Sequence, residues 1–381
     1  MLGYGFQWID ESDVAAVVEA LRSDFLTQGP GVAKFEQELC RMTGAKFCVA
    51  LSNATAALHL AVAALELGSD TEGITSPNTF LASSNCMVYN NVRPMFADID
   101  AVSYNINPAE IERKLTNKTK VLIPVHFAGL PCDMKKIYEI AVGHGLKVIE
   151  DAAHAIGSHY EDGSPVGCCK WSDMTVFSFH PVKTITTGEG GAITTNDEEL
   201  YRRLLMLRSH GTTKDSELLT QNPGPWYYEM QMLGFNYRMT DIQAALGYSQ
   251  LQKLSSFKGR RREIVARYND AFRSLRHVTT PVEPEGTSSC FHLYVAQIDF
   301  VALGKGRSQV MKELQEKGVG TQVHYIPVHT QPYYQKNFGY AYGDYPVAER
   351  YYERTLSLPL YPLMSDAEVD LVISAVMEVV A

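Results

Sequence analysis

A lysine that follows a short apolar segment is the first residue in this sequence whose surroundings point to chemistry. Lys183 comes after the apolar run at 175–179 and before the Thr/Gly-rich loop at 184–191, and neither segment carries a second cation. Most lysines are solvated surface charges. Partial burial at this position would lower the pKa of the Lys183 amine and free it to condense with an aldehyde.

An acid follows a second apolar segment. Asp151 lies at the end of a buried strand whose apolar pattern covers 147–149, and small residues follow it. Its carboxylate could cap a following helix. It could also pair with a protonated pyridine nitrogen, because a carboxylate in that place keeps the ring charged and able to stabilise a carbanion.

A turn of small residues precedes the first buried helical pattern. Ser52-Asn53-Ala54-Thr55 follows the apolar segment at 47–51. Such a turn could present backbone N–H groups to a phosphate at a helix N-terminus, or it could form a capped helix without a ligand. A lysine for an aldehyde, an acid for a pyridine and a cradle for a phosphate, each after a strand, together indicate pyridoxal 5′-phosphate (PLP) as the cofactor.

Short apolar segments alternate with helical spacing through the first two thirds of the chain. The expected strands are 47–51, 73–75, 94–96, 121–125, 147–149, 175–179 and 192–195. This alternation predicts an α/β protein with a mixed, mostly parallel sheet that helices cover on both faces. Ligands bind such sheets beyond the carboxyl ends of the strands, where Lys183 and Asp151 are expected to lie.

The pattern changes near residue 255. A long amphipathic helix comes first, and the expected elements after it are strand, helix, strand and helix at 291–298, 310–317, 321–325 and 367–380. We expect a large PLP-binding domain over 1–254, which includes the N-terminal segment, and a smaller α+β domain over 255–381. The basic run Arg260-Arg261-Arg262 is expected to lie on a solvated helix face.

Composition and charge argue against several classes of protein. The formal net charge of -9 argues against a nucleic-acid partner, because binding nucleic acid requires a basic face. No apolar run is long enough for a membrane span, and the N-terminus lacks the pattern of a secretory signal. The seven cysteines are scattered without a Cys-x-x-Cys pair, which favours free thiols, no metal site and a reducing, cytoplasmic location.

Motifs spread over nearly the whole chain match one known family. The most specific are Phe-Ser-Phe-His-Pro-Val-Lys at 177–183 and Ile-Thr-Thr-Gly-Glu-Gly-Gly at 185–191. The others are Leu26-Thr27-Gln28-Gly29, Asn53-Ala54-Thr55, Pro77-Asn78-Thr79-Phe80, Asp151-Ala152-Ala153-His154, Arg208-Ser209-His210-Gly211, Asn236-Tyr237-Arg238, Gln322-Val323-His324-Tyr325 and Ser357-Leu358-Pro359. With these motifs the chain resembles the DegT/DnrJ/EryC1/StrS family of fold-type I, PLP-dependent sugar aminotransferases. The resemblance is strongest to the subgroup that makes UDP-4-amino-4,6-dideoxy-N-acetyl-β-L-altrosamine for pseudaminic acid biosynthesis, although Thr184 replaces a proline common in that subgroup.

The resemblance implies roles for single residues around the cofactor. Lys183 matches the lysine that binds the cofactor aldehyde, and Asp151 matches the partner of the pyridine nitrogen. Phe80 matches an aromatic residue against the ring, and His154 matches a contact of the ring's phenolic oxygen. The positions that match the phosphate-binding residues are Ala54, Thr55, Ser178 and, from the neighbouring subunit, Asn236. A homodimer with the active site at its subunit interface is therefore implied.

The resemblance also implies the substrates. The positions that match the nucleotide-sugar pocket of the altrosamine subgroup are Tyr4, Asp24, Phe25, Leu26, Thr27, Ala54, Ser178, Asn236, Gln322, Val323, His324 and Tyr325. Arg238 is a candidate cation for the carboxylates of the donor or the diphosphate of the acceptor. The implied reaction moves the amino group of L-glutamate to the C4 ketone of a UDP-linked 2-acetamido-2,6-dideoxy-4-keto-hexose.

Other functions stay open beside this one. The nearest is amination of another nucleotide-linked 3- or 4-keto-sugar, with dTDP or GDP as the nucleotide. A regulator that binds PLP without turnover is disfavoured, because strand and helix patterns begin almost at residue 1 and leave no room for an added DNA-binding domain. A purely structural protein is disfavoured because all three cofactor elements are present. Lys183 disfavours the branch of the family that dehydrates sugars, which carries histidine at this position.

Overall fold

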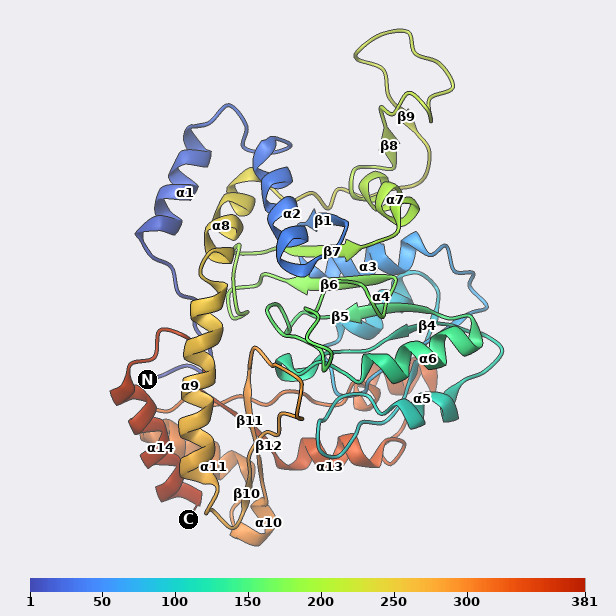
Figure 1. Ribbon diagram of the computed structural model, residues 1–381. Coiled ribbons are helices and arrows are strands. Elements are labelled where there is room, and N and C mark those ends of the chain that lie inside the picture. The colour runs from blue at the N-terminus through green and yellow to red at the C-terminus, as the bar shows by residue number, and fades with distance from the viewer. Residues whose placement is uncertain (381) are drawn as a thin grey trace.

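A seven-stranded sheet forms the centre of the protein, whose computed structural model describes residues 1–380. Its strands are β1 (Phe47–Leu51), β2 (Glu72–Thr75), β3 (Arg93–Phe96), β4 (Thr119–Ile123), β5 (Lys147–Asp151), β6 (Met174–Ser178) and β7 (Gly191–Thr195). They are ordered β1-β7-β6-β5-β4-β2-β3 (Figure 1). β7 runs antiparallel to β1 and β6, and the other neighbours are parallel. The prediction of a mixed, mostly parallel α/β sheet is therefore confirmed.

Helices cover both faces of this sheet because its strands are apolar on both sides. Val49 and Leu51 of β1 belong to one core cluster, whereas Cys48 and Ala50 point to the opposite face and belong to another. The helices of the first cluster are α3 (Ala54–Ala64), α4 (Ala82–Tyr89) and α7 (Glu198–Arg208). Those of the second are α2 (Pro30–Thr43), α5 (Pro108–Lys114), α6 (Met134–His144) and α8 (Asp241–Leu251), and α1 (Glu11–Arg22) lies beside α8 (Figure 1).

A smaller antiparallel sheet lies in the second part of the chain. Its strands, in order across the sheet, are β10 (Val278–Thr279), β11 (Tyr294–Ile298) and β12 (Thr355–Leu358). The helices around it are α9 (Leu254–Phe272), α10 (Phe300–Leu303), α11 (Arg307–Glu316) and α14 (Asp366–Val380). Figure 1 shows α9 running from the large sheet to the small one. The expected domain boundary after residue 254 falls in the first turn of α9 and stays a prediction.

The segment that joins β11 to β12 is rich in aromatic residues. Its regular elements are the short helices η2 (Val328–Thr330), α12 (Pro332–Phe338) and α13 (Pro346–Arg354). Tyr334 and Tyr345 pack with Phe96 and with Phe127 of the short helix η1 (Phe127–Gly129) in one cluster. The expected strand at 321–325 is wrong, because only Gln322 pairs with the small sheet, through two backbone hydrogen bonds with Ser357.

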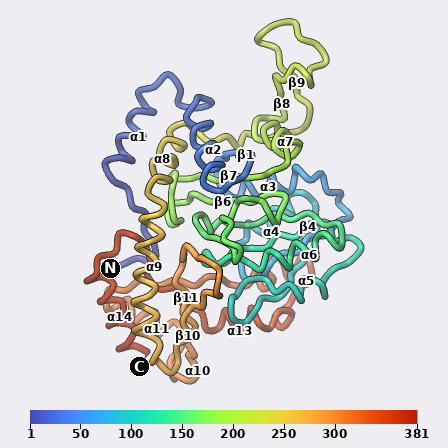
Figure 2. Tube along the Cα trace, in the orientation of Figure 1, coloured from blue at the N-terminus to red at the C-terminus, as the bar shows by residue number. Residues whose placement is uncertain are grey.

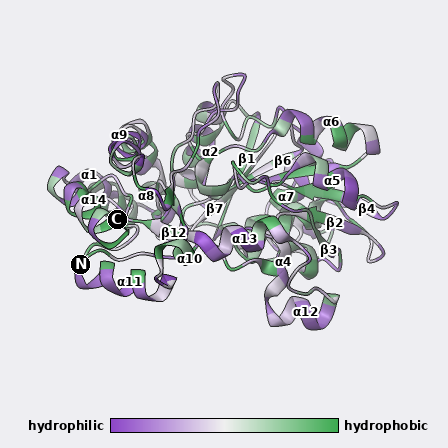
Figure 3. Ribbon diagram, turned by 90° about the horizontal axis from the view of Figure 1, so that it is seen from below, coloured by the Kyte–Doolittle hydropathy of each residue, from purple (hydrophilic) through white to green (hydrophobic). Residues whose placement is uncertain are grey.

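The outer parts of the molecule complete this arrangement. The N-terminus lies beside α14 (Figure 2), where Leu2 forms a parallel bridge with Val319. A narrow hairpin of β8 (Thr212–Thr213) and β9 (Glu229–Met230) projects beyond α7 (Figure 1). The peripheral helices α5, α11 and α12 are largely hydrophilic (Figure 3), as expected for helices with a solvated face.

Arg261 does not lie on a solvated face. It shares the buried stripe of α9 with Phe257, Ile264 and Tyr268, and only 1% of it is exposed. Its guanidinium donates to the backbone carbonyls of Phe291, His292 and Leu360. Burial lowers the pKa of Arg261 to about 10. The expected solvated basic run is thus wrong for this residue, because helical spacing turns it inward while its two neighbours form ion pairs.

Two further properties concern membranes and metals. Within residues 1–380, no helix combines the length and the apolar character that a bilayer crossing requires. In the same span, no group of three or more His, Cys, Asp or Glu side chains is arranged to hold a metal ion. The cysteines are free thiols, and most of them are buried.

Candidate active site

The ends of two neighbouring strands bring the predicted catalytic residues to one edge of the sheet. β5 ends at Asp151 and β6 ends at Ser178, and these strands pair in parallel with Asp151 opposite Val176. Lys183 lies in the loop that leaves β6, where its backbone N–H donates to the carbonyl of His180 over 2.8 Å. Lys183 and Asp151 are therefore held on adjacent elements at the carboxyl edge, as expected from the sequence.

The environment of Lys183 prepares its amine for reaction. The side chain is partly buried. Burial lowers the pKa of Lys183 to about 8, and the negative charge of Asp151 opposes part of that shift. At pH 7 roughly one amine in ten is then neutral, compared with fewer than one in a thousand for an ordinary lysine. An amine of this kind can condense with an aldehyde and can also move protons.

Asp151 does not cap a helix. Residues 152–173, between β5 and β6, form turns and bends and contain no helix, and Asp151 Oδ1 accepts a hydrogen bond from Ala153 N–H over 3.0 Å. Ser83 donates to the other carboxylate oxygen, Oδ2, over 2.6 Å. Asp151 is 5% exposed. These two donors leave lone pairs on the carboxylate that a ring N–H can use.

The turn at 52–55 has free N–H donors at the start of α3. Asn53 caps the helix, because its Oδ1 accepts from Ala56 N–H over 2.8 Å. Among residues 1–380, the backbone N–H groups of Ala54 and Thr55 have no acceptor. In the register of the sheet, Gly191 lies between Leu51 and Ser178, so the turn and Ser178 share one edge. Together with Lys183 and Asp151, these groups fit the phosphate, aldehyde and ring nitrogen of PLP.

Aromatic and histidine side chains surround this edge. Tyr325 lies near Phe80, with ring centroids 6.3 Å apart, and its hydroxyl is 3.1 Å from Nε2 of His154. Tyr4 lies against His324, with ring centroids 5.2 Å apart. Burial is the main cause that lowers the pKa of His154 well below its usual value and that of His324 to about 3, and the nearby Lys183 charge adds to both shifts. Both imidazoles are therefore neutral at neutral pH.

Other predicted site residues lie apart from Lys183 within one chain. The segment Asp24–Thr27 lies at the start of α8, where Asp241 N–H donates to the carbonyl of Leu26 over 3.0 Å. Asn236 is exposed and pairs with Ser209 beyond α7. Among residues 1–380, no hydrogen bond links Asp24–Thr27, Gln322, Val323 or Asn236 to Lys183 or Asp151. Their expected roles stay predictions.

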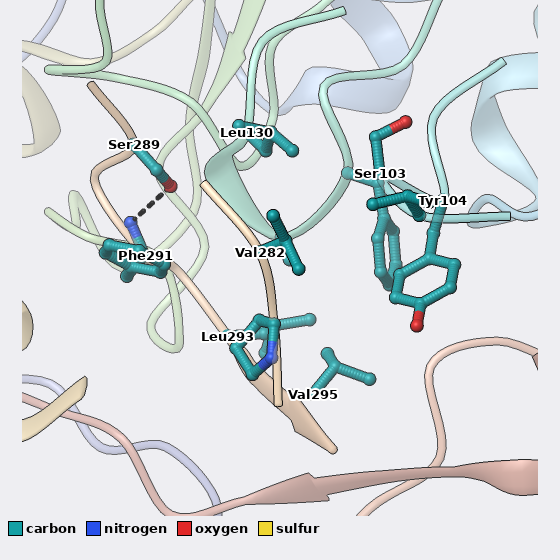
Figure 4. Close-up of a pocket in the computed structure, with 12 residues that line it drawn as sticks. Ser103, Tyr104, Leu130, Val282, Ser289, Phe291, Leu293 and Val295 are labelled. Carbon is teal, nitrogen blue, oxygen red and sulfur yellow. Dashed lines mark hydrogen bonds between the residues drawn. The ribbon is translucent and has the colours of Figure 1, made fainter. Parts of the chain in front are cut away.

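Phe127 and Ser83 belong to the site although the sequence did not single them out. Phe127 contacts Tyr325 with ring centroids 6.2 Å apart, and it also lines a small apolar cavity with Tyr104, Val282 and Leu293 (Figure 4). That cavity has no charged side chain in its wall, and Lys183 and Asp151 do not line it, so it is separate from the cofactor edge. The only local signal for Ser83 is its place three residues after Phe80.

Comparisons with known proteins agree with this geometry. Residues 7–377 match the DegT/DnrJ/EryC1/StrS aminotransferase family. The chain is 44% identical over 380 residues to the spore coat polysaccharide biosynthesis protein SpsC of Bacillus subtilis, covering 100% of this chain and 97% of that protein.

Solved structures give the same result. Helicobacter pylori PseC, an aminotransferase involved in the biosynthesis of pseudoaminic acid, superimposes with a TM-score of 0.92 at 31% identity, covering 100% of this chain and 99% of that one. Spr1654 of Streptococcus pneumoniae, assigned as a sugar aminotransferase, superimposes in its PMP form with a TM-score of 0.92 at 33% identity, with the same coverage of both chains, and it is also known in a PLP form. The chain therefore belongs to the DegT/DnrJ/EryC1/StrS aminotransferase family and is a PLP-dependent sugar aminotransferase.

Proposed function

We propose that the enzyme transfers the amino group of L-glutamate to the C4 ketone of a UDP-linked 2-acetamido-2,6-dideoxy-4-keto-hexose, giving UDP-4-amino-4,6-dideoxy-N-acetyl-β-L-altrosamine. The observation that carries the chemistry is the presence of Lys183, whose pKa is lowered to about 8, near Asp151 at the carboxyl edge of the sheet. The sugar rests on the likeness to PseC along the whole chain and on the cluster of Tyr4, His324 and Tyr325.

The proposed roles around the cofactor follow from the donors described above. When bound, PLP supplies an electron sink for the carbanion that forms at the substrate carbon. Lys183 binds the aldehyde, and Asp151 holds a proton on the ring nitrogen. The N–H groups of Ala54 and Thr55, with the hydroxyl of Ser178, bind the phosphate. His154 and Phe80 contact the ring.

Lys183 then serves as the proton carrier. Lys183 would hold the aldehyde of the cofactor until the amino donor binds, and its freed amine would then take the proton from Cα of L-glutamate. With the keto-sugar bound in place of the donor, the same amine would deliver a proton to the sugar carbon that receives the nitrogen. Its pKa of about 8 suits both steps, because an acid–base group works best when its pKa is near the operating pH.

Tyr325 is the proposed hydrogen-bond donor to the substrate. Ala128 N–H donates to Nδ1 of His154 over 3.3 Å, so the neutral His154 ring carries its proton on Nε2, facing the Tyr325 oxygen. The Tyr325 hydroxyl then keeps its own proton for a ligand. Burial raises the pKa of Tyr325 above its usual value, so this hydroxyl stays protonated.

We also propose a homodimer in which Asn236 of the partner subunit reaches the phosphate. Support comes from apolar side chains exposed near Asn236, of which Leu233 is 77% and Met230 60% exposed. A groove lined by His59 and Tyr89 extends from Leu233 to Asn53 and Thr55 at the start of α3. A second copy of the chain would cover this surface and complete the site.

A mixing experiment tests both the chemistry and the shared site. Lys183→Ala and Asn236→Ala homodimers should each be inactive or nearly so with L-glutamate. After the two variants are mixed, unfolded and refolded together, about a quarter of the wild-type activity should return, because half the dimers are mixed and one of their two sites is intact. No recovery would contradict the sharing of Asn236. Full turnover by Lys183→Ala alone would contradict the chemistry.

A second acceptor is favoured by one observation. The identity to SpsC, at 44%, exceeds the identity to PseC, at 31%, and SpsC is named for spore coat polysaccharide rather than for pseudoaminic acid. Another nucleotide-linked 3- or 4-keto-sugar, with dTDP or GDP, is therefore the alternative acceptor. Matched 3-keto and 4-keto sugars on UDP, dTDP and GDP, with 15N-labelled L-glutamate and mass analysis of the products, distinguish the two, and preference for a dTDP or GDP sugar would rule out the UDP assignment.

A further inference from the structure

A row of hydroxyl groups leads from the start of α4 to Asp151. Ser83 Oγ lies 2.6 Å from Asp151 Oδ2, and Thr79 Oγ1 lies 2.7 Å from Ser83 Oγ. Ser83 is fully buried, and Thr79 is 2% exposed. The proton transfers proposed above use neither residue, so the row requires an explanation of its own.

The direction of these hydrogen bonds follows from what each group can donate. An ionised carboxylate only accepts, so the single proton of Ser83 points to Asp151. Ser83 Oγ then accepts from the hydroxyl of Thr79. The other acceptor near Ser83, the carbonyl of Phe80, is farther away, at 3.3 Å. Because a hydroxyl that accepts a hydrogen bond becomes a better donor, Thr79 strengthens the bond that Ser83 gives to Asp151.

We propose that Ser83 is a positioning residue that keeps the proton shared between Asp151 and the PLP ring on the ring nitrogen. With Ala153 N–H on Oδ1, Ser83 on Oδ2 fixes the plane of the carboxylate. Held in this plane, the carboxylate has lone pairs left to accept the ring N–H, so the hydrogen bond to the nitrogen is kept in place. This inference rests on the proposed role of Asp151.

The neighbouring serine gives a matched control. Ser84 is also fully buried in α4, but its hydroxyl bonds to Tyr334 over 2.7 Å and not to Asp151. Ser83→Ala and Ser84→Ala therefore each remove one buried hydroxyl from the same helix, and they differ in whether that hydroxyl reaches Asp151. Ser83→Thr restores a hydroxyl at the first position.

Cofactor binding and spectra provide the measurements. For Ser83→Ala, fluorescence titration of the apo-enzyme should show about tenfold weaker PLP binding, the cost of one lost hydrogen bond to a charged group. The pH midpoint of the bound cofactor's visible absorbance should shift, and kcat should fall about tenfold with KM for L-glutamate nearly unchanged. Ser83→Thr should recover these values, and Ser84→Ala should keep them while unfolding at a lower temperature.

A PLP analogue with carbon in place of the ring nitrogen separates this role from simple packing. The analogue has no ring proton for Asp151 to hold, so Ser83→Ala and the wild-type protein should bind it equally well. An equal loss of affinity for PLP and for the analogue would overturn the proposal, as would Ser84→Ala behaving like Ser83→Ala. Failure of the proposed function has a different signature, in which the wild-type protein forms no borohydride-reducible bond to PLP at Lys183.

Discussion

Lys183 and Asp151 affect each other through charge as well as through position. The carboxylate raises the pKa of Lys183, but burial lowers it by more, and the result is about 8. The same lack of solvent keeps His154 and His324 neutral. Lys183 therefore titrates near neutral pH while the imidazoles around it stay uncharged.

The pKa of Lys183 predicts how PLP enters the apo-enzyme. Only the neutral amine attacks an aldehyde, so the rate of incorporation should rise about tenfold per pH unit below pH 8 and level off above it. Stopped-flow absorbance of the bound cofactor measures this rate. Asp151→Asn removes the charge that raises the pKa, so its plateau should begin at a lower pH. A wild-type rate that keeps rising to pH 10 would show an ordinary, solvated lysine.

The sequence predicts single site residues that directly follow strands, and it misses those that other elements bring to the site. Lys183 and Asp151 stand out because apolar segments precede them. Ser83 lies 68 positions from Asp151, and the local sequence does not distinguish it from Ser84, the other buried serine of α4. A contact of that kind depends on how α4 packs against the sheet, which the local sequence does not contain.

At the cofactor edge, β7 lies very close to the start of α3. A Cβ built on Gly191 would lie 2.6 Å from the backbone nitrogen of Ala54, so glycine is needed for the turn to pack on the strand. The sequence predicts a strand at 192–195 and a helix after the turn at 52–55, but their close approach follows from the antiparallel pairing of β1 with β7. The same limit explains why the stretch 321–325 is not a strand, because only Gln322 finds a partner.

Gly191→Ala should therefore damage the phosphate cradle. We expect a loss of about 1–3 kcal/mol in the free energy of unfolding, typical of overpacking, and at least about tenfold weaker PLP binding as the turn moves. Urea unfolding and fluorescence titration measure these effects. Gly143→Ala is the control, because a Cβ there meets nothing within 4 Å, and in helix α6 it should stabilise by about 0.5–1 kcal/mol. Normal PLP affinity in Gly191→Ala would contradict the assignment of the cradle.

Several apolar side chains are exposed on the surface of the molecule beside the groove that leads to α3. Met230, Leu233 and Trp226 are each at least 60% exposed, and they lie on or next to the hairpin that projects beyond α7 (Figure 1). Exposed apolar groups that gather on one surface mark a binding site more often than scattered ones do. The sequence could not predict this surface, because exposure depends on the complete fold.

Leu233→Asp should weaken the proposed dimer. A charge in an apolar interface loses its hydration without gaining a partner, so monomer should appear in analytical ultracentrifugation at micromolar concentrations, and PLP affinity should fall with it. Val301→Asp is the control, because Val301 is 93% exposed on α10, in the second part of the chain. If Leu233→Asp stayed dimeric with normal affinity for PLP, the interface would have to lie on another surface.

The hairpin also has an internal support, in Glu229. Its carboxylate accepts from the hydroxyl and the backbone N–H of Thr220, from the hydroxyl of Tyr227 and from the backbone N–H of Gln221, and these bonds lower the pKa of Glu229 to about 2. These hydrogen bonds hold the projecting arm in one shape within the isolated chain. A second copy of the chain that docks on this arm would lose little conformational entropy, because the arm is already ordered, and assembly should be fast. Only strong acid, in which the Glu229 carboxylate takes up a proton, would remove this effect.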